Sequence, residues 1–149
     1  MEFGWINIFG AIIVVLILFP NIIYAVKKNR QDNTKTEVPQ YLSVCEQIGR
    51  YGCVVLMWLP FLVWKFGFRN TEELLIYLLA NGILLLSYYL FWIFYSRKKN
   101  LPKAMALAII PTVIFLLSGI LLRHWSLVAA AAIFGFAHCK ITYMTHKEY

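Results

Sequence analysis

The sequence predicts an all-α integral membrane protein, a bundle of five transmembrane helices with the N-terminus outside and the C-terminus inside. Of its 149 residues, 61% are hydrophobic and 17% are aromatic. One soluble core of this size cannot bury that much apolar surface, so lipid must cover the remainder. Apolar runs long enough to cross a bilayer recur five times along the chain. Basic residues collect in alternate links between these runs.

The distribution of the 14 basic residues fixes the expected sidedness. The segment 27–50 carries five of them and the segment 97–103 carries four, whereas the link 65–69 carries two and the corner at Arg123 carries one. Translocating Lys and Arg is unfavourable, so the richer segments are expected to face the cytoplasm. The formal charge of +7 is thereby assigned to topology and to anionic lipid headgroups, and nucleic acid is not an expected partner.

The first span is expected at about 3–26, ended by Lys27 and Lys28. No basic residue precedes this run and it exceeds 20 residues, so we expect it to remain as a span and not to be cleaved as a signal peptide. The segment 27–40 is rich in Asn, Gln, Lys, Thr and Asp. This composition predicts a cytoplasmic loop.

After Pro39 we expect an interfacial amphipathic turn or two of helix that runs directly into the second span, at about 48–68. Pro60 lies at the middle of this run and predicts a kink.

The third span is expected at 72–95, where Asn70 can cap the helix and two acidic residues favour its positive end. The fourth is expected at 102–122, with Pro102 suited to a first helical turn. The fifth is expected at 125–144, and the very short link before it predicts an antiparallel hairpin.

Polar residues of the third span share one face. Tyr77, Asn81, Tyr88 and Tyr95 fall within a sector of about 40°, which is expected to point into the bundle because a lipid-facing amide would lack partners. Asn81 could orient a substrate headgroup or an ion, or it could hydrogen-bond a neighbouring helix.

In the first span, Asn7 and Asn21 also share a face, and the Asn21 amide is expected to satisfy the carbonyl that Pro20 leaves unpaired. Two stripes of small or polar residues predict close packing of the last two spans. The residues are Ala104, Ala108, Thr112 and Gly119 in one span and Ala131, Gly135, His138 and Thr142 in the other.

His138 is an ionisable residue inside a span, about 20 Å from the outer boundary. A proton relay or a haem ligand needs a second group at the same depth, and neither His124 nor His146 provides one. No Cys/His cluster has zinc-site spacing, so neither a cofactor nor a metal is expected. We therefore expect His138 to be a neutral, hydrogen-bonded packing residue, with a functional role as the alternative.

Glu46 and Arg50 lie four residues apart in the stretch EQIGRYG, so they can pair on one helix face while Gly49 and Gly52 admit a neighbouring backbone. The pair could hold a lipid headgroup or gate an inner mouth, or it could be an interfacial salt bridge that fixes the position of the helix. This stretch resembles small multi-span bacterial membrane proteins for which no activity is known. The likeness extends to Asn81 and Gly82 and to the region around Arg123.

The sequence contains no Ser/His/Asp set, no paired intramembrane carboxylates, no phosphate-binding loop and no CxxC motif. We therefore expect a non-enzymatic accessory, sensing or protective component, multi-pass in a bacterial cell membrane, that contacts lipid and either another membrane protein or a second copy of itself. The alternative is a small carrier or lipid-binding protein, alone or as a homodimer. The candidate lining residues are Asn81, Tyr77, Tyr88, His138, Glu46 and Arg50.

Overall fold

The computed structural model describes residues 6–28, 37–59, 61 and 67–147. Residues 3–5 of the expected first span and residues 29–36 of the expected loop lie outside this part of the chain. The regular elements of the described part are five α-helices, which confirms the predicted all-α class. They are α1 (Ile8–Lys28), α2 (Gln40–Trp58), α3 (Thr71–Arg97), α4 (Leu101–Leu121) and α5 (Trp125–His146).

Four helices of the described residues, α1, α3, α4 and α5, are long and apolar enough to cross a membrane. Their outward faces carry many exposed large side chains, such as Ile12, Leu79 and Phe136. Contiguous apolar surface of this extent is typical of a membrane-embedded protein. Helix α2 is not among the four, because its sequence, which contains Gln40, Glu46, Gln47 and Arg50, is less apolar.

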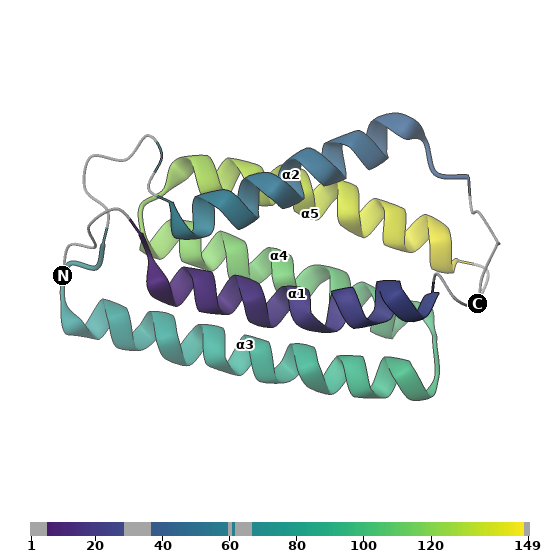
Figure 1. Cartoon of the computed structure of the whole chain (residues 1–149), viewed down its shortest axis with the longest axis horizontal. Helices are drawn as coiled ribbons and strands as arrows, with labels where there is room; N and C mark the ends of the chain where they lie inside the picture. Colours follow the sequence, from purple (N-terminus) through teal and green to yellow (C-terminus); the bar gives the residue numbers. More distant parts are fainter. Residues whose placement is uncertain (1–5, 29–36, 60, 62–66, 148–149) are drawn as a thin grey trace.

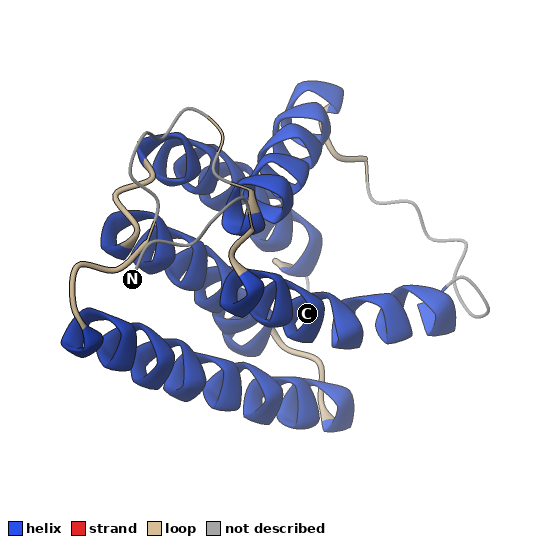
Figure 2. Ribbon diagram, turned by 60° about the vertical axis from the view of Figure 1, so that its left-hand side comes forward, coloured by secondary structure: helices blue, strands red, loops and turns tan. Residues whose placement is uncertain are grey.

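Consecutive helices run in opposite directions and lie side by side along one long axis (Figure 1). Helix α4 packs between α3 and α5, and α2 packs mainly on α5. Helix α1 lies against α2 and α3. Helices α1 and α2 meet near the start of α1 and the end of α2, and they diverge toward their opposite ends (Figures 1 and 2).

Helix α2 ends earlier than the predicted second span. It begins directly after Pro39, and the amphipathic stretch runs without a break into the rest of the helix, as predicted. It ends at Trp58, and Leu59 is extended, as is usual for a residue that precedes a proline. Gly67, with φ 144°, is not helical either, so a helix from 48 to 68 was wrong. Pro60 itself, with its predicted kink, lies outside the described residues.

Pro20 lies inside α1, and its missing N–H leaves the carbonyl of Leu16 without its usual helical partner. The hydroxyl of Tyr89, on α3, donates to this carbonyl at 2.7 Å. The amide of Asn21 donates instead to the carbonyl of Ile17, at 3.0 Å. The prediction that Asn21 would satisfy the carbonyl freed by Pro20 was therefore wrong. A neighbouring helix supplies the donor.

The hairpin of α4 and α5 packs closely, as the small residues predicted. A Cβ placed on Gly135 would lie 2.3 Å from Cγ2 of Thr112, and one placed on Gly119 would lie 2.8 Å from Cγ2 of Val128. At the start of α4, the side chain of Asn100 accepts from the backbone N–H of Lys103, and a proline occupies the first turn. The contacts of Gly119 and Gly135 bring the backbones of the two helices together.

The predicted polar face of α3 does point inward. Its buried residues are Tyr77, Asn81, Tyr88 and Tyr95.

Candidate functional site

The candidate site begins with the close approach of α2 to α5. A Cβ on Gly49 would lie 2.7 Å from both Cα and N of Phe134, so only glycine allows the two backbones this separation. One turn along α2, Gly52 faces the methyl group of Ala130. Glu46 lies on the same helix face as Gly49, and it is therefore carried into the interface with α5 and not out to the surface.

One carboxylate oxygen of Glu46 contacts the side chains of both Arg50 and His138. Its Oε1 accepts a hydrogen bond from Nη2 of Arg50, four residues later, and lies 3.0 Å from Nδ1 of His138 on α5. The Glu46 side chain is only 7% exposed, whereas that of Arg50 is 39% exposed. Glu46 thus forms the buried base of the cluster, and Arg50 forms its accessible part.

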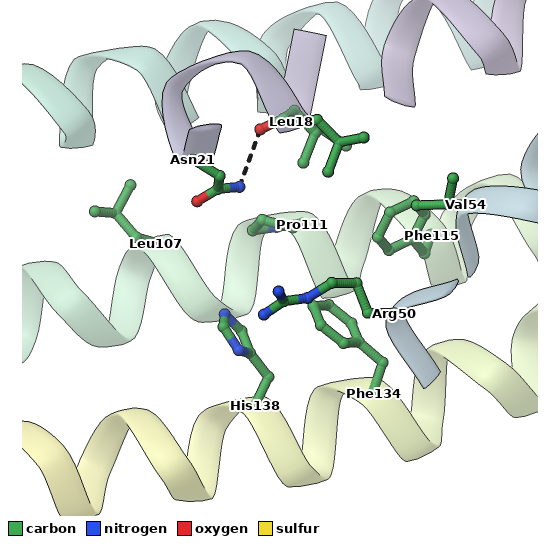
Figure 3. Close-up of a pocket in the computed structure, with 10 residues that line it drawn as sticks. Leu18, Asn21, Arg50, Val54, Leu107, Pro111, Phe115, Phe134 and His138 are labelled. Atoms are coloured by element: carbon green, nitrogen blue, oxygen red, sulfur yellow. Dashed lines mark hydrogen bonds between the residues drawn. The ribbon is translucent and has the colours of Figure 1, made fainter. Parts of the chain in front are cut away.

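Arg50 and His138 lie at the polar end of a pocket of about 230 Å³. Figure 3 shows their side chains directed toward one another from α2 and α5, with Asn21 of α1 facing them from the opposite side. The remaining walls are apolar, and the Phe134 ring stacks on His138 at a centroid distance of 4.9 Å. The other lining residues are Ile17, Leu18, Val54, Leu107, Pro111 and Phe115.

The cluster lies well inside the bundle. Arg50 is ten residues from the start of α2, which is about 15 Å along a helix. His138 is eight residues from the end of α5, which is about 12 Å. An ion pair at such a depth is unfavourable unless its charges are balanced and its polar atoms find partners. Glu46 provides this balance for Arg50.

The predicted pairing of Glu46 with Arg50 is confirmed, but the structure corrects the surroundings that the sequence suggested for it. We expected the pair at the cytoplasmic entrance of the second span, and it lies further along α2, where this helix packs against α5. We also found no second group at the depth of His138, and Glu46 is that group. The missing signal was the contact between α2 and α5, which joins residues 92 positions apart.

Tyr88 of α3 connects to the pocket through Asn21. The Asn21 amide donates to the Tyr88 hydroxyl at 2.9 Å, and this hydroxyl lies 3.4 Å from the carbonyl oxygen of Ile17. Tyr88 is almost fully buried. It therefore sets the position of Asn21 without lining the pocket itself.

Tyr77 and Asn81 lie apart from this pocket. The Asn81 amide donates to the carbonyl of Tyr77 in its own helix, and its Oδ1 has no hydrogen-bond partner in the described part of the chain. The Tyr77 hydroxyl lies beside Asn7 and Ser118, in a fully buried polar group. The six sequence candidates thus divide into two places: Glu46, Arg50 and His138 form one cluster with Tyr88 behind it, and Tyr77 and Asn81 lie elsewhere.

The cluster offers chemistry suited to holding a ligand. Arg50 supplies guanidinium N–H donors, Asn21 an amide and His138 an imidazole, all on apolar walls. Among the described residues, no three His, Cys, Asp or Glu side chains gather in a way that could hold a metal ion.

The resemblance to small multi-span bacterial membrane proteins stays a prediction, because neither the fold nor the pocket tests it. Comparison with protein-family models, with curated proteins and with solved structures finds no match to this chain.

Proposed function

We propose that this chain is a non-enzymatic, five-span protein of a bacterial cell membrane that acts as an accessory or sensing component by binding an amphiphilic molecule in the pocket beside Arg50. The pocket favours the lipid-binding alternative raised by the sequence, because an apolar cavity with a few convergent polar groups is the usual form of a small-molecule site. The single observation that carries the proposal is this cavity of about 230 Å³, with a guanidinium at its polar end.

The directions of the helices support a topology with the N-terminus outside and the C-terminus inside. The ends of α1, α3 and α5 and the starts of α2 and α4 lie at one end of the bundle (Figure 1). Arg97, Lys98, Lys99 and Lys103 lie at this end. Arg69 and Arg123 lie at the other end, near Glu73, which forms an ion pair with Arg123 at 3.0 Å. One end of the bundle is therefore basic and the other nearly neutral. Basic links usually face the cytoplasm, so the basic end is assigned to the cytoplasmic side.

The location of α2 supports a fifth span. Its 19 residues cover about 28 Å, close to the thickness of the bilayer hydrocarbon, and it packs along α5. Its polar residues Glu46 and Arg50 face the bundle and each other, which is how charged residues are accommodated within a membrane.

To test the proposal, a residue that lines the pocket is replaced by a larger one. In Leu18→Trp, a larger side chain enters the cavity, so amphiphiles that co-purify with the protein in mild detergent should be lost. The matched control is Phe19→Trp, because Phe19 is 58% exposed and points away from the bundle. Bound molecules are extracted and identified by mass spectrometry. Equal retention by wild type and Leu18→Trp would refute the proposal.

A further inference from the structure

The accessible charge of the pocket is positive. Arg50 is 39% exposed and lines the cavity, whereas the Glu46 side chain is 7% exposed and already accepts from both Arg50 and His138. A ligand that enters from the pocket therefore meets the guanidinium before the carboxylate. A cationic head group would be repelled by Arg50, and an anionic one would be attracted to it.

The hydrogen-bonding groups favour an oxyanion. A guanidinium has five N–H donors in a planar fork, and in the described residues its only partner is one carboxylate oxygen of Glu46. The remaining donors match the spacing of carboxylate or phosphate oxygens. His138 donates through Nδ1 to Glu46, so in the neutral imidazole Nε2 is an acceptor, and the oxyanion is bound by the N–H donors of Arg50.

The size and the apolar walls of the pocket favour an amphiphile. Its volume of about 230 Å³ is below that of most sites that enclose a whole ligand, so it has room for a head group and the first part of a chain. Its walls are largely apolar, with Leu18 of α1 and Val54 of α2 among the lining residues (Figure 3). An acyl chain can extend along these apolar side chains, which α1 and α2 contribute.

We propose that the pocket binds an oxyanion-headed lipid, with its phosphate or carboxylate on Arg50 beside His138 and its acyl chain along the apolar side chains that α1 and α2 contribute. This inference rests on the proposed function and adds the chemical class of the ligand. It assigns Arg50 as the residue that distinguishes an anionic lipid from a zwitterionic one.

The experiment measures lipid binding by native mass spectrometry of the full-length protein in neutral detergent. The probes are dioleoylphosphatidylglycerol, oleate, dioleoylphosphatidylcholine and inorganic phosphate. Wild type should bind the two anionic lipids more tightly than phosphatidylcholine. Arg50→Gln should weaken phosphatidylglycerol binding about tenfold or more. The matched control Arg97→Gln removes one charge from an exposed position at the last residue of α3, away from the pocket, and should change binding by less than about twofold.

Arg50→Lys keeps the charge but lacks the planar fork, so its affinity for phosphatidylglycerol should lie between those of wild type and Arg50→Gln. It also provides the measurement if Arg50→Gln does not fold. An Arg50→Lys protein that bound as tightly as wild type would contradict recognition by the fork.

Failure of this inference is distinguishable from failure of the proposed function. Equal weakening by Arg50→Gln and Arg97→Gln would show surface attraction only and would overturn the inference. Equal binding of phosphatidylglycerol and phosphatidylcholine, both lost in Leu18→Trp, would overturn the anionic class but keep the proposed function. If inorganic phosphate displaced phosphatidylglycerol at an equal concentration, the pocket would be a site for free anions. This result would overturn the assignment of a lipid as the ligand. Binding unaffected by Leu18→Trp would refute the proposed function itself.

Discussion

At the residue scale, one carboxylate determines whether the cluster of Glu46, Arg50 and His138 is tolerated inside the bundle. Removing one member of a buried ion pair leaves the other charge without a partner, whereas replacing both with apolar residues is often neutral or stabilising. Because Arg50 remains partly exposed, the cost of removing Glu46 is expected to be reduced by residual solvation.

Glu46→Leu should therefore lower the free energy of unfolding by about 1–3 kcal/mol. The double variant Glu46→Leu, Arg50→Leu should recover most of this loss, since no uncompensated charge remains. Equilibrium unfolding in mixed micelles measures each protein of the cycle. A double variant that is less stable than either single variant would contradict the assigned pairing.

Two buried asparagines should respond differently to replacement by leucine. The Asn7 amide donates to the carbonyl of Met57, and its Oδ1 accepts from the N–H of Gly10. Within the described ranges, the side chain of Asn81 bonds only to the carbonyl of Tyr77 in its own helix. Asn7→Leu should cost about 1–2 kcal/mol of stability, and Asn81→Leu should be within about 0.5 kcal/mol of wild type or more stable.

The same unfolding measurement separates these outcomes. Lipid binding by Asn81→Leu should equal that of wild type, because Asn81 does not line the pocket. A variant that folds normally but loses binding would return Asn81 to the functional site.

The residue scale also shows where sequence reasoning succeeded. Helical spacing alone predicted the inward face of α3 and the pairing of Glu46 with Arg50, because both depend only on the geometry of one helix. The contact of Glu46 with His138 depends on which helices are neighbours, and no local spacing contains that information. For the same reason the bond from Tyr89 to the carbonyl of Leu16 was not predicted.

At the scale of elements, the packing of α2 on α5 holds the pocket together. The fourth and fifth helices were predicted to pack because a short link joins them. The partner of α2 was not predicted, because Gly49 and Gly52 predict that some helix approaches closely but do not identify which one.

Gly49→Ala should separate α2 from α5, since the added methyl group would meet the backbone of Phe134. The expected cost is about 1–3 kcal/mol of stability, together with weaker lipid binding, because Arg50 and His138 would move apart. The matched control is Gly82→Ala on α3, where a Cβ has no neighbour within 4 Å. This control should be neutral or more stable by up to about 1 kcal/mol. Equal effects of the two substitutions would contradict the close approach.

At the scale of the whole molecule, the alternating helix directions lead to a prediction of sidedness. A reporter fused before Met1 should be active only outside the cytoplasm, and one fused after Tyr149 only inside it. An additional accessible cysteine near Asn70 should react with a membrane-impermeant reagent added from outside, and one near Asn100 should not. Termini found in the same compartment would rule out five spans.

The donor that Tyr89 provides to α1 has a consequence for biogenesis. The carbonyl it satisfies belongs to Leu16, and the two residues are separated by 73 positions. In the proposed topology, the first helix therefore enters the bilayer with the carbonyl of Leu16 lacking the N–H that Pro20 cannot supply. The Tyr89 hydroxyl reaches this carbonyl only after the third helix has been inserted, so we expect α1 to reach its final conformation after α3 is in place.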